Sequence, residues 1–291
     1  MSGALGWLLE PLAYPFMLRG LLAALIVGVV CPVLGTYVVL RGMAFLGDAL
    51  AHIMLPGVVV AFLLGWPLGF GALVAGVAAA LLIGAISRRT DIKEDAAIGV
   101  VFAGAFALGI ALLSFQRSYA VDLAHLLFGN LLGVSTFDLW LEAALGVVVL
   151  LTVLAFYKEF LVLSFDQVLA TTLRLPVAFL HYLLLVLVAV VIVASIQAVG
   201  VALVLAMLVT PASAGYLLTR RLPRMMLIGA AIGAGSAVVG LYLSYYANLA
   251  SGPAIVLVET VLFLTILAAS PRRMLLWPRR RAREGRSEAS A

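Results

Sequence analysis

Long apolar stretches separated by short polar breaks run through the whole chain of 291 residues. One membrane crossing needs about 20 apolar residues. The stretches that meet this length lie at 16–40, 46–65, 68–87, 96–116, 134–156, 177–197, 199–218, 226–247 and 253–270. Between them, Leu123–Val134 is interrupted by glycine and asparagine, so we expect a short re-entrant or interfacial piece there. The pattern predicts an all-α, polytopic membrane protein with eight or nine transmembrane helices.

Composition leaves no room for a soluble domain. Hydrophobic residues make up 65% of the chain and charged residues 11%, which is far from the balance of a soluble globular protein. We therefore expect one transmembrane domain over residues 1–271, followed by a basic, disordered tail over 272–291. The N-terminal segment carries Glu10 and Arg19 and lacks the pattern of a signal peptide, so its apolar stretch is expected to remain as a helix.

Lysine and arginine residues predict the orientation, because short cytoplasmic loops are enriched in them. They gather in alternate loops and in the tail: Arg88, Arg89, Lys93, Lys158, Arg174, Arg220, Arg221, Arg224 and the arginines from Arg272 onward. With nine helices all these positions share one side, which places the C-terminus in the cytoplasm and the N-terminus outside. Such a tail suits contact with anionic lipid, and we expect no nucleic-acid partner.

Asp48 and His52 stand out because the following stretch, through Ser87, contains no charged residue. An ionisable group inside a membrane costs about 2.5–3.5 kcal/mol on insertion scales and therefore suggests a function. Four residues apart on a helix, the two side chains share one face. A carboxylate and an imidazole form half of a site for Mn²⁺, Fe²⁺ or Zn²⁺. The alternative is a structural hydrogen bond that locks two helices together. Pro56 and Gly57 predict an irregular helix.

Glu259 is a second deep acid, in the last apolar stretch. It could complete a metal site with Asp48 and His52, from the same or a facing subunit. Equally, it could pair with Arg41 or accept a hydrogen bond from a neighbouring serine or threonine. Counting along the helices places Glu259 and Asp48 nearer opposite faces of the membrane.

Three further positions carry weaker predictions. His125 follows an aspartate by three residues and could be a peripheral metal contact, although such pairs more often cap a short helix. His181 is expected at the membrane interface. Asp138 and Glu142 lie one turn apart near a membrane edge, where we expect both to be solvated.

No enzyme motif is present in the sequence. The Gly-x-Ser-x-Gly, His-Glu-x-x-His and Walker A patterns are all missing. The chain therefore cannot hydrolyse ATP on its own.

Five segments resemble, in order and over almost the whole chain, the permease subunits of metal-importing ABC transporters, the family that handles zinc, manganese and iron. They are Leu40–His52 with the Leu-Pro-Gly that follows, Ile92–Gly99, Asp122–Asn130, Gly200–Ala212, and Ser251–Pro253 leading to Glu259. The resemblance implies the fold of the metal and vitamin B12 importer permeases, in the plasma or inner membrane of a prokaryote. It also implies a second permease copy, a cytoplasmic ATP-binding subunit and an extracytoplasmic metal-binding protein.

The resemblance further implies functional residues. Asp48 and His52 match the family's metal contacts. Pro211, Arg220, Arg221 and Arg224 belong to a segment that looks like the region coupled to the ATPase. The divalent ion is cargo, and no permanently bound cofactor is implied.

Several functions remain open from the sequence. An incomplete ligand shell suits an ion in transit, and the lack of a His-rich loop leads us to favour Mn²⁺ slightly over Zn²⁺ or Fe²⁺. A permease for a bulkier chelate, such as a siderophore or cobalamin, would leave Asp48 and His52 structural. An ion-coupled secondary transporter would have only Asp48 and Glu259 as coupling acids. A non-transporting scaffold would leave the deep pair without a purpose.

Overall fold

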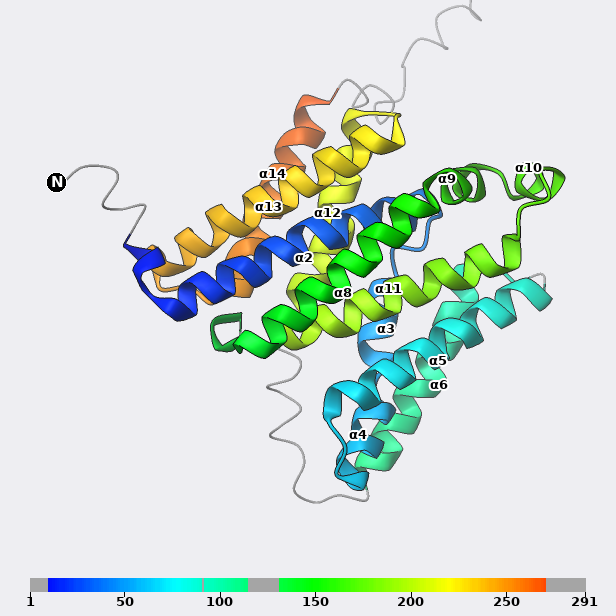
Figure 1. The fold of residues 1–291 in the computed structure, drawn as a ribbon, viewed down its shortest axis with the longest axis horizontal. Coiled ribbons are helices and arrows are strands. Elements are labelled where there is room, and N and C mark those ends of the chain that lie inside the picture. The colour runs from blue at the N-terminus through cyan, green and yellow to red at the C-terminus, as the bar shows by residue number, and fades with distance from the viewer. Residues whose placement is uncertain (1–9, 91, 115–130, 271–291) are drawn as a thin grey trace, which may run out of the picture.

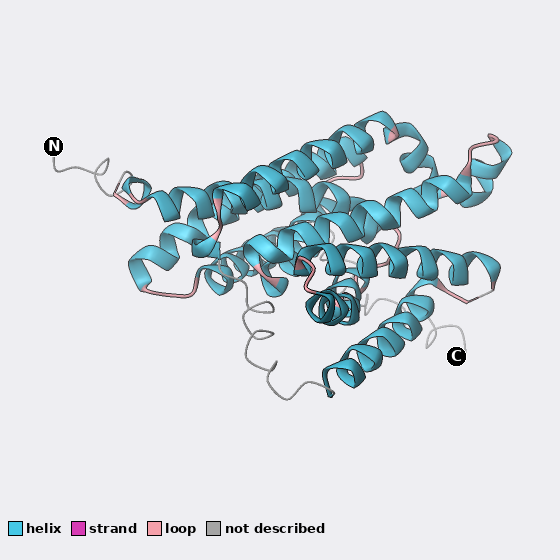
Figure 2. Cartoon of the chain, turned by 60° about the horizontal axis from the view of Figure 1, so that its bottom comes forward, coloured by secondary structure: helices cyan, strands magenta, loops and turns pink. Residues whose placement is uncertain are grey.

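The computed structural model describes residues 10–90, 92–114 and 131–270, and within these residues every regular element is a helix (Figure 2). Nine spans in this part of the chain are long and apolar enough to cross a membrane. The predicted all-α membrane fold is confirmed, with nine spans rather than eight. His125 and the basic tail lie outside the described residues, as does most of the segment Leu123–Val134.

The spans begin and end within a few residues of the predicted stretches. They are α2 (Pro15–Leu40), α3 (Leu46–Ile53) with α4 (Leu55–Leu64), α5 (Leu68–Arg89), α6 (Glu94–Ser114), α8 (Thr136–Ala155), α11 (Val177–Val199), α12 (Val201–Leu218), α13 (Leu222–Ala247) and α14 (Ser251–Ala269). Four short elements lie outside them: η1 (Pro11–Ala13), η2 (Leu131–Gly133), α9 (Tyr157–Phe165) and α10 (Gln167–Thr172).

The helices form two groups, which helices α11 and α3 connect. Helices α2, α12, α13 and α14 pack on one another, and so do α4, α5 and α6. Helix α11 contacts both α2 and α5, and α3 contacts α5, α6, α11 and α12 (Figure 1). The short helix α3 therefore lies where the two groups meet.

Close approach between helices depends on small residues, as expected in lipid, where burial of apolar surface gives no drive for association. A Cβ atom on Gly28 of α2 would meet the backbone of Gly233 in α13 at 2.9 Å. Gly35 of α2 lies against the Leu208 carbonyl of α12 in the same way. These two contacts bring α2 against both neighbours.

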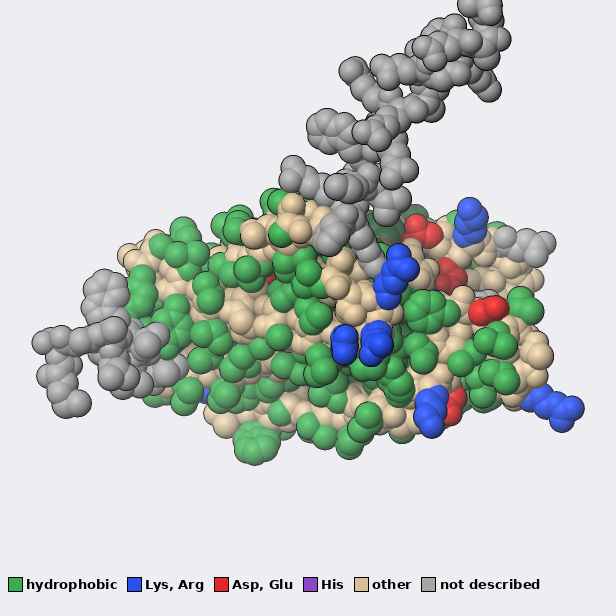
Figure 3. All heavy atoms as spheres, turned by 90° about the horizontal axis from the view of Figure 1, so that it is seen from above, with side chains coloured by type: hydrophobic (Ala, Val, Ile, Leu, Met, Phe, Trp, Pro, Cys, Tyr) green, Lys and Arg blue, Asp and Glu red, His purple; other side chains and the backbone are tan. Residues whose placement is uncertain are grey.

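Basic side chains gather at one end of the molecule. The end of α5, the short helices α9 and α10, and the turn between α12 and α13 all lie toward the same end (Figure 1). On the face shown in Figure 3, most Lys and Arg side chains occupy that half, while hydrophobic side chains cover the other. This is the clustering that the charge pattern predicted, and we call it the basic end.

Candidate functional site

Helix α3 is brought into the middle of the molecule by a tight reversal after α2. Gly42 has a φ of +72°, a left-handed conformation that glycine adopts without strain and that commonly ends helices. Its amide and that of Met43 bond back to the carbonyls of Val39 and Val38. Gly47 then lets α3 pack closely on α12, since a Cβ there would meet Leu208 at 3.0 Å.

The span that contains Asp48 and His52 is broken, as the sequence predicted. Helix α3 ends at Ile53, Met54 separates the two pieces, and α4 begins at Leu55 with a proline in its first turn. Pro56 has no amide proton, so it cannot donate to the carbonyl of His52, four residues earlier. The interruption thus falls directly after the histidine.

The hydrogen bonding of His52 determines which ring nitrogen is free. Its Nδ1 lies 2.9 Å from the backbone carbonyl oxygen of Asp48. A carbonyl can only accept, so Nδ1 carries the proton and donates it. Nε2 is then unprotonated and has the lone pair that a metal ion requires.

The Asp48 carboxylate lies beside the His52 ring but makes no hydrogen bond to it. Oδ1 of Asp48 is 3.6 Å from Nδ1 of His52, which is too far for a hydrogen bond. Both residues belong to α3, so the pair does not lock two helices together. The Asp48 and His52 side chains are 42% and 30% exposed in the single chain. Both side chains are therefore partly exposed in one chain taken alone.

Two phenylalanines form one wall of this site. Phe102 and Phe106, one turn apart on α6, stack on each other at 5.8 Å and meet the His52 ring edge-on at 5.8 and 5.7 Å. The aromatic wall fixes the plane of the imidazole. A fixed ring leaves its free nitrogen with a defined direction.

Glu259 does not join this pair within one chain. It lies on α14, is fully buried, and neither carboxylate oxygen has a hydrogen-bond partner among the described residues. Helix α14 packs on α12 and α13. Among the described residues, no three His, Cys, Asp or Glu side chains come together as a metal site. The alternative partner suggested for Glu259, Arg41, is engaged elsewhere.

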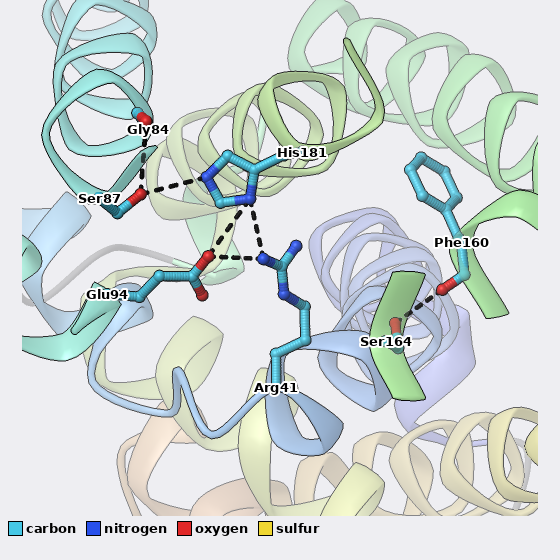
Figure 4. A network of polar contacts seen from close by, with 7 residues as sticks. All are labelled: Arg41, Gly84, Ser87, Glu94, Phe160, Ser164 and His181. Atoms are coloured by element: carbon cyan, nitrogen blue, oxygen red, sulfur yellow. Dashed lines mark hydrogen bonds and ion pairs between the residues drawn. The ribbon is translucent and has the colours of Figure 1, made fainter. Parts of the chain in front are cut away.

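Arg41 forms the centre of a polar network that sequence reasoning missed (Figure 4). Nη2 of Arg41 donates to Oε1 of Glu94 at 2.5 Å and to Nδ1 of His181 at 2.8 Å. The other ring nitrogen of His181 lies 3.4 Å from Oγ of Ser87. The network joins the ends of α2 and α5 to the starts of α6 and α11, next to the turn that leads into α3.

The partners in this network fix the protonation of the His181 ring. Oε1 of Glu94 lies 3.3 Å from Nδ1, but the closer partner at 2.8 Å is the Arg41 guanidinium, which only donates. Nδ1 therefore accepts and the proton sits on Nε2, facing Ser87. His181 is buried near the start of α11, and its position at the membrane interface stays a prediction. Burial lowers the pKa of the Arg41 guanidinium, and the neighbouring Glu94 carboxylate opposes that shift. No local sequence pattern could reveal this network, because its contacts span 53 and 140 residues of sequence.

Glu142 differs from the expectation that it is solvated, whereas Asp138 is partly exposed. Asp138 caps the start of α8: its Oδ2 accepts from the Ser135 amide, and the Ser135 hydroxyl accepts from the Asp138 amide. Glu142, one turn further along, is only 5% exposed. Helix α11 packs against the part of the molecule that carries Glu142, helix α8.

The residues suggested for ATPase coupling lie at the basic end. Arg220, Arg221 and Arg224 are exposed around the turn between α12 and α13, whereas Pro211 is buried inside α12. Any part that Pro211 plays is therefore indirect. A cavity of about 430 Å³ beside the turn is lined by Arg220, Tyr216 and, from α9, Phe165.

Comparison with known proteins shows which family this chain belongs to. The family model described as ABC 3 transport family matches residues 13–270. The manganese transport system membrane protein MntC of Halalkalibacterium halodurans is 46% identical over 276 residues, covering 94% of each chain. The chelated iron transport system membrane protein YfeD of Yersinia pestis is 42% identical, over 89% of this chain and 86% of its own.

A solved structure agrees with these sequence matches. PsaBC from Streptococcus pneumoniae in complex with Fab superimposes with a TM-score of 0.81 at 38% identity, over 94% of this chain and 98% of that chain. The match thus extends across all nine spans of the described residues. The chain belongs to the ABC 3 transport family.

Proposed function

We propose that this chain is the permease subunit of an ATP-driven importer for a divalent transition metal, with Mn²⁺ the favoured ion. The observation that carries the proposal is the Asp48–His52 pair, which lies on a short helix within an interrupted membrane span. The chain that holds it is 46% identical to a manganese transport protein. The location that follows is the plasma membrane of a bacterium.

The chemistry of the pair suits an ion in transit. One carboxylate and one imidazole nitrogen are ligands that Mn²⁺, Fe²⁺ and Zn²⁺ accept. A closed set of four strong ligands would hold the ion for too long, because structural metal sites are worth many kcal/mol. Conduction requires binding that is strong enough to admit the ion and weak enough to release it.

The exposure of the pair supports a second permease copy. Asp48 and His52 lie in a membrane span, yet 42% and 30% of their side chains are uncovered in one chain. Two copies related by a two-fold axis along this face would bring together two carboxylates and two imidazoles. The pathway would then run between the copies, with Phe102 and Phe106 beside it. Glu259 and His125 remain proposed contacts of lower weight.

An ATP-binding subunit is proposed to dock at the basic end. Arg220, Arg221 and Arg224 are exposed there. The neighbouring helices α9 and α10 present Phe165 and Val168, which are 63% and 75% exposed, outside the spans where lipid would cover them. Large apolar side chains exposed to water mark contact sites. A metal-binding protein would deliver the ion at the opposite end.

Metal accumulation in cells tests the proposed substrate. A bacterium without its own manganese uptake would express the chain with an ATP-binding subunit and a metal-binding protein, and cell-associated metals would be measured by mass spectrometry. We expect Mn²⁺ to accumulate when it is supplied as the free ion. Accumulation of iron only in the presence of a chelator would instead support the chelate permease, as the name of the 42% identical YfeD, a chelated iron transport protein, indicates for that relative.

A further inference from the structure

A cavity of about 440 Å³ opens at the end of the molecule opposite the basic end, between the start of α5, the start of α8 and the end of α11. Most of its wall is apolar. Three oxygen-bearing side chains line it as well: Asp138 and Glu142 from α8, and Gln197 from α11. All three lie within about two turns of a helix end, so the cavity is close to the membrane surface, where water and ions reach it.

Glu142 is the unusual member of this set. It is 95% buried, and neither carboxylate oxygen has a hydrogen-bond partner among the described residues. Ser195 lies nearby on α11 but does not reach the geometry of a hydrogen bond. A buried carboxylate without a partner is costly and calls for a proton or a cation. The cavity gives a cation access to this one.

Asp138 and Gln197 supply further oxygens at the same place. One carboxylate oxygen of Asp138, Oδ2, is used in the helix cap with Ser135, whereas Oδ1 takes part in no hydrogen bond among the described residues. The amide of Gln197 lies directly against Gly69 of α5, and a Cβ atom at that glycine would overlap it. The absence of a side chain at residue 69 therefore makes room for the amide in the cavity wall.

We propose that this cavity binds a hydrated divalent cation through Asp138, Glu142 and Gln197, at a site separate from the Asp48–His52 pair. The donors are all oxygens, the ligand type of hard ions such as Mg²⁺, Ca²⁺ and Mn²⁺. Such ions are commonly held by one or two carboxylates with water completing the shell. Since water occupies about 30 Å³ in the liquid, the cavity holds an ion with several waters.

Asp166 provides a control carboxylate for this proposal. It caps α10, where its Oδ1 accepts from the amides of Val168 and Leu169, and it does not line the cavity. Cation binding should therefore depend on Glu142 and not on Asp166.

The test measures Mn²⁺ binding to the purified full chain in lipid nanodiscs by electron paramagnetic resonance, without any transport. In an Asp48→Asn/His52→Ala background, we expect one Mn²⁺ per chain to remain bound. Adding Glu142→Gln should weaken this binding at least tenfold, whereas adding Asp166→Asn should leave it unchanged. Gly69→Ala, which displaces only a flexible amide, should weaken binding in a chain that still folds.

Two results would overturn the proposal: no bound Mn²⁺ in the Asp48→Asn/His52→Ala background, or equal binding by the Glu142→Gln and Asp166→Asn chains. Competition by Mg²⁺ and Ca²⁺ against the bound Mn²⁺ identifies which hard ion the site prefers. Neither readout depends on metal uptake, so failure here leaves the proposed transport function standing.

Discussion

At the scale of single residues, the free nitrogen of His52 follows from one hydrogen bond. The protonated Nδ1 of His52 donates to the Asp48 carbonyl, so in the neutral ring Nε2 is the nitrogen that can bind a metal, beside a carboxylate that makes no hydrogen bond to the ring. The spacing of Asp48 and His52 was sufficient to predict a shared helix face. Their exposure was not predictable, because it depends on which surfaces of α3 and α6 remain uncovered in one chain.

The Arg41 network leads to a prediction about stability. Arg41→Met leaves the Glu94 carboxylate without its guanidinium, and loss of one partner of a buried ion pair typically costs about 3–5 kcal/mol. We expect about 3 kcal/mol, since Glu94 is 21% exposed. Arg41→Met/Glu94→Gln removes both charges and should recover part of the loss. Thermal unfolding in detergent measures Arg41→Met, Glu94→Gln and the double variant. A double variant whose loss of stability equals the sum of the two single losses would refute the coupling.

At the scale of helices, the pattern of apolar stretches was almost sufficient. The nine observed spans of the described residues match the predicted ones, and the break after His52 follows from Pro56. The short helices α9 and α10 had no such signal, because they lie outside the apolar stretches. The burial of Glu142 also could not be predicted, since it depends on how α11 packs against α8. The local periodicity of apolar residues does not predict contacts between segments that are distant in sequence.

The close contact of α2 with α13 gives a prediction at this scale. Gly233→Val should push the helices apart, because a Cβ there overlaps the Gly28 backbone; overpacking costs about 1–3 kcal/mol or more. Gly235→Val is the matched control on the same helix, with nothing within 4 Å of its Cβ. Thermal unfolding should show a large loss for the first variant and little change for the second. Equal losses would mean that helix propensity, rather than packing, is responsible.

At the scale of the whole molecule, the basic end defines an orientation that can be measured. Cys31, the single cysteine, is fully buried, so the unmodified chain should not react with a membrane-impermeant maleimide. Asn248→Cys should be labelled in intact cells. Arg89→Cys should be labelled only after the cells are permeabilised, because the basic end is expected in the cytoplasm. The reverse pattern would invert the proposed orientation and the direction assigned to transport.

The most direct test of the central claim is Mn²⁺ uptake by vesicles that contain the permease, its ATP-binding subunit and its binding protein. Uptake by the unmodified chain would be compared with that of His52→Ala, and assembly of each complex would be checked by size-exclusion chromatography. We predict ATP-dependent Mn²⁺ uptake that falls at least tenfold in the variant, with assembly intact. Equal uptake by the two assembled complexes would contradict the account and remove His52 from the pathway.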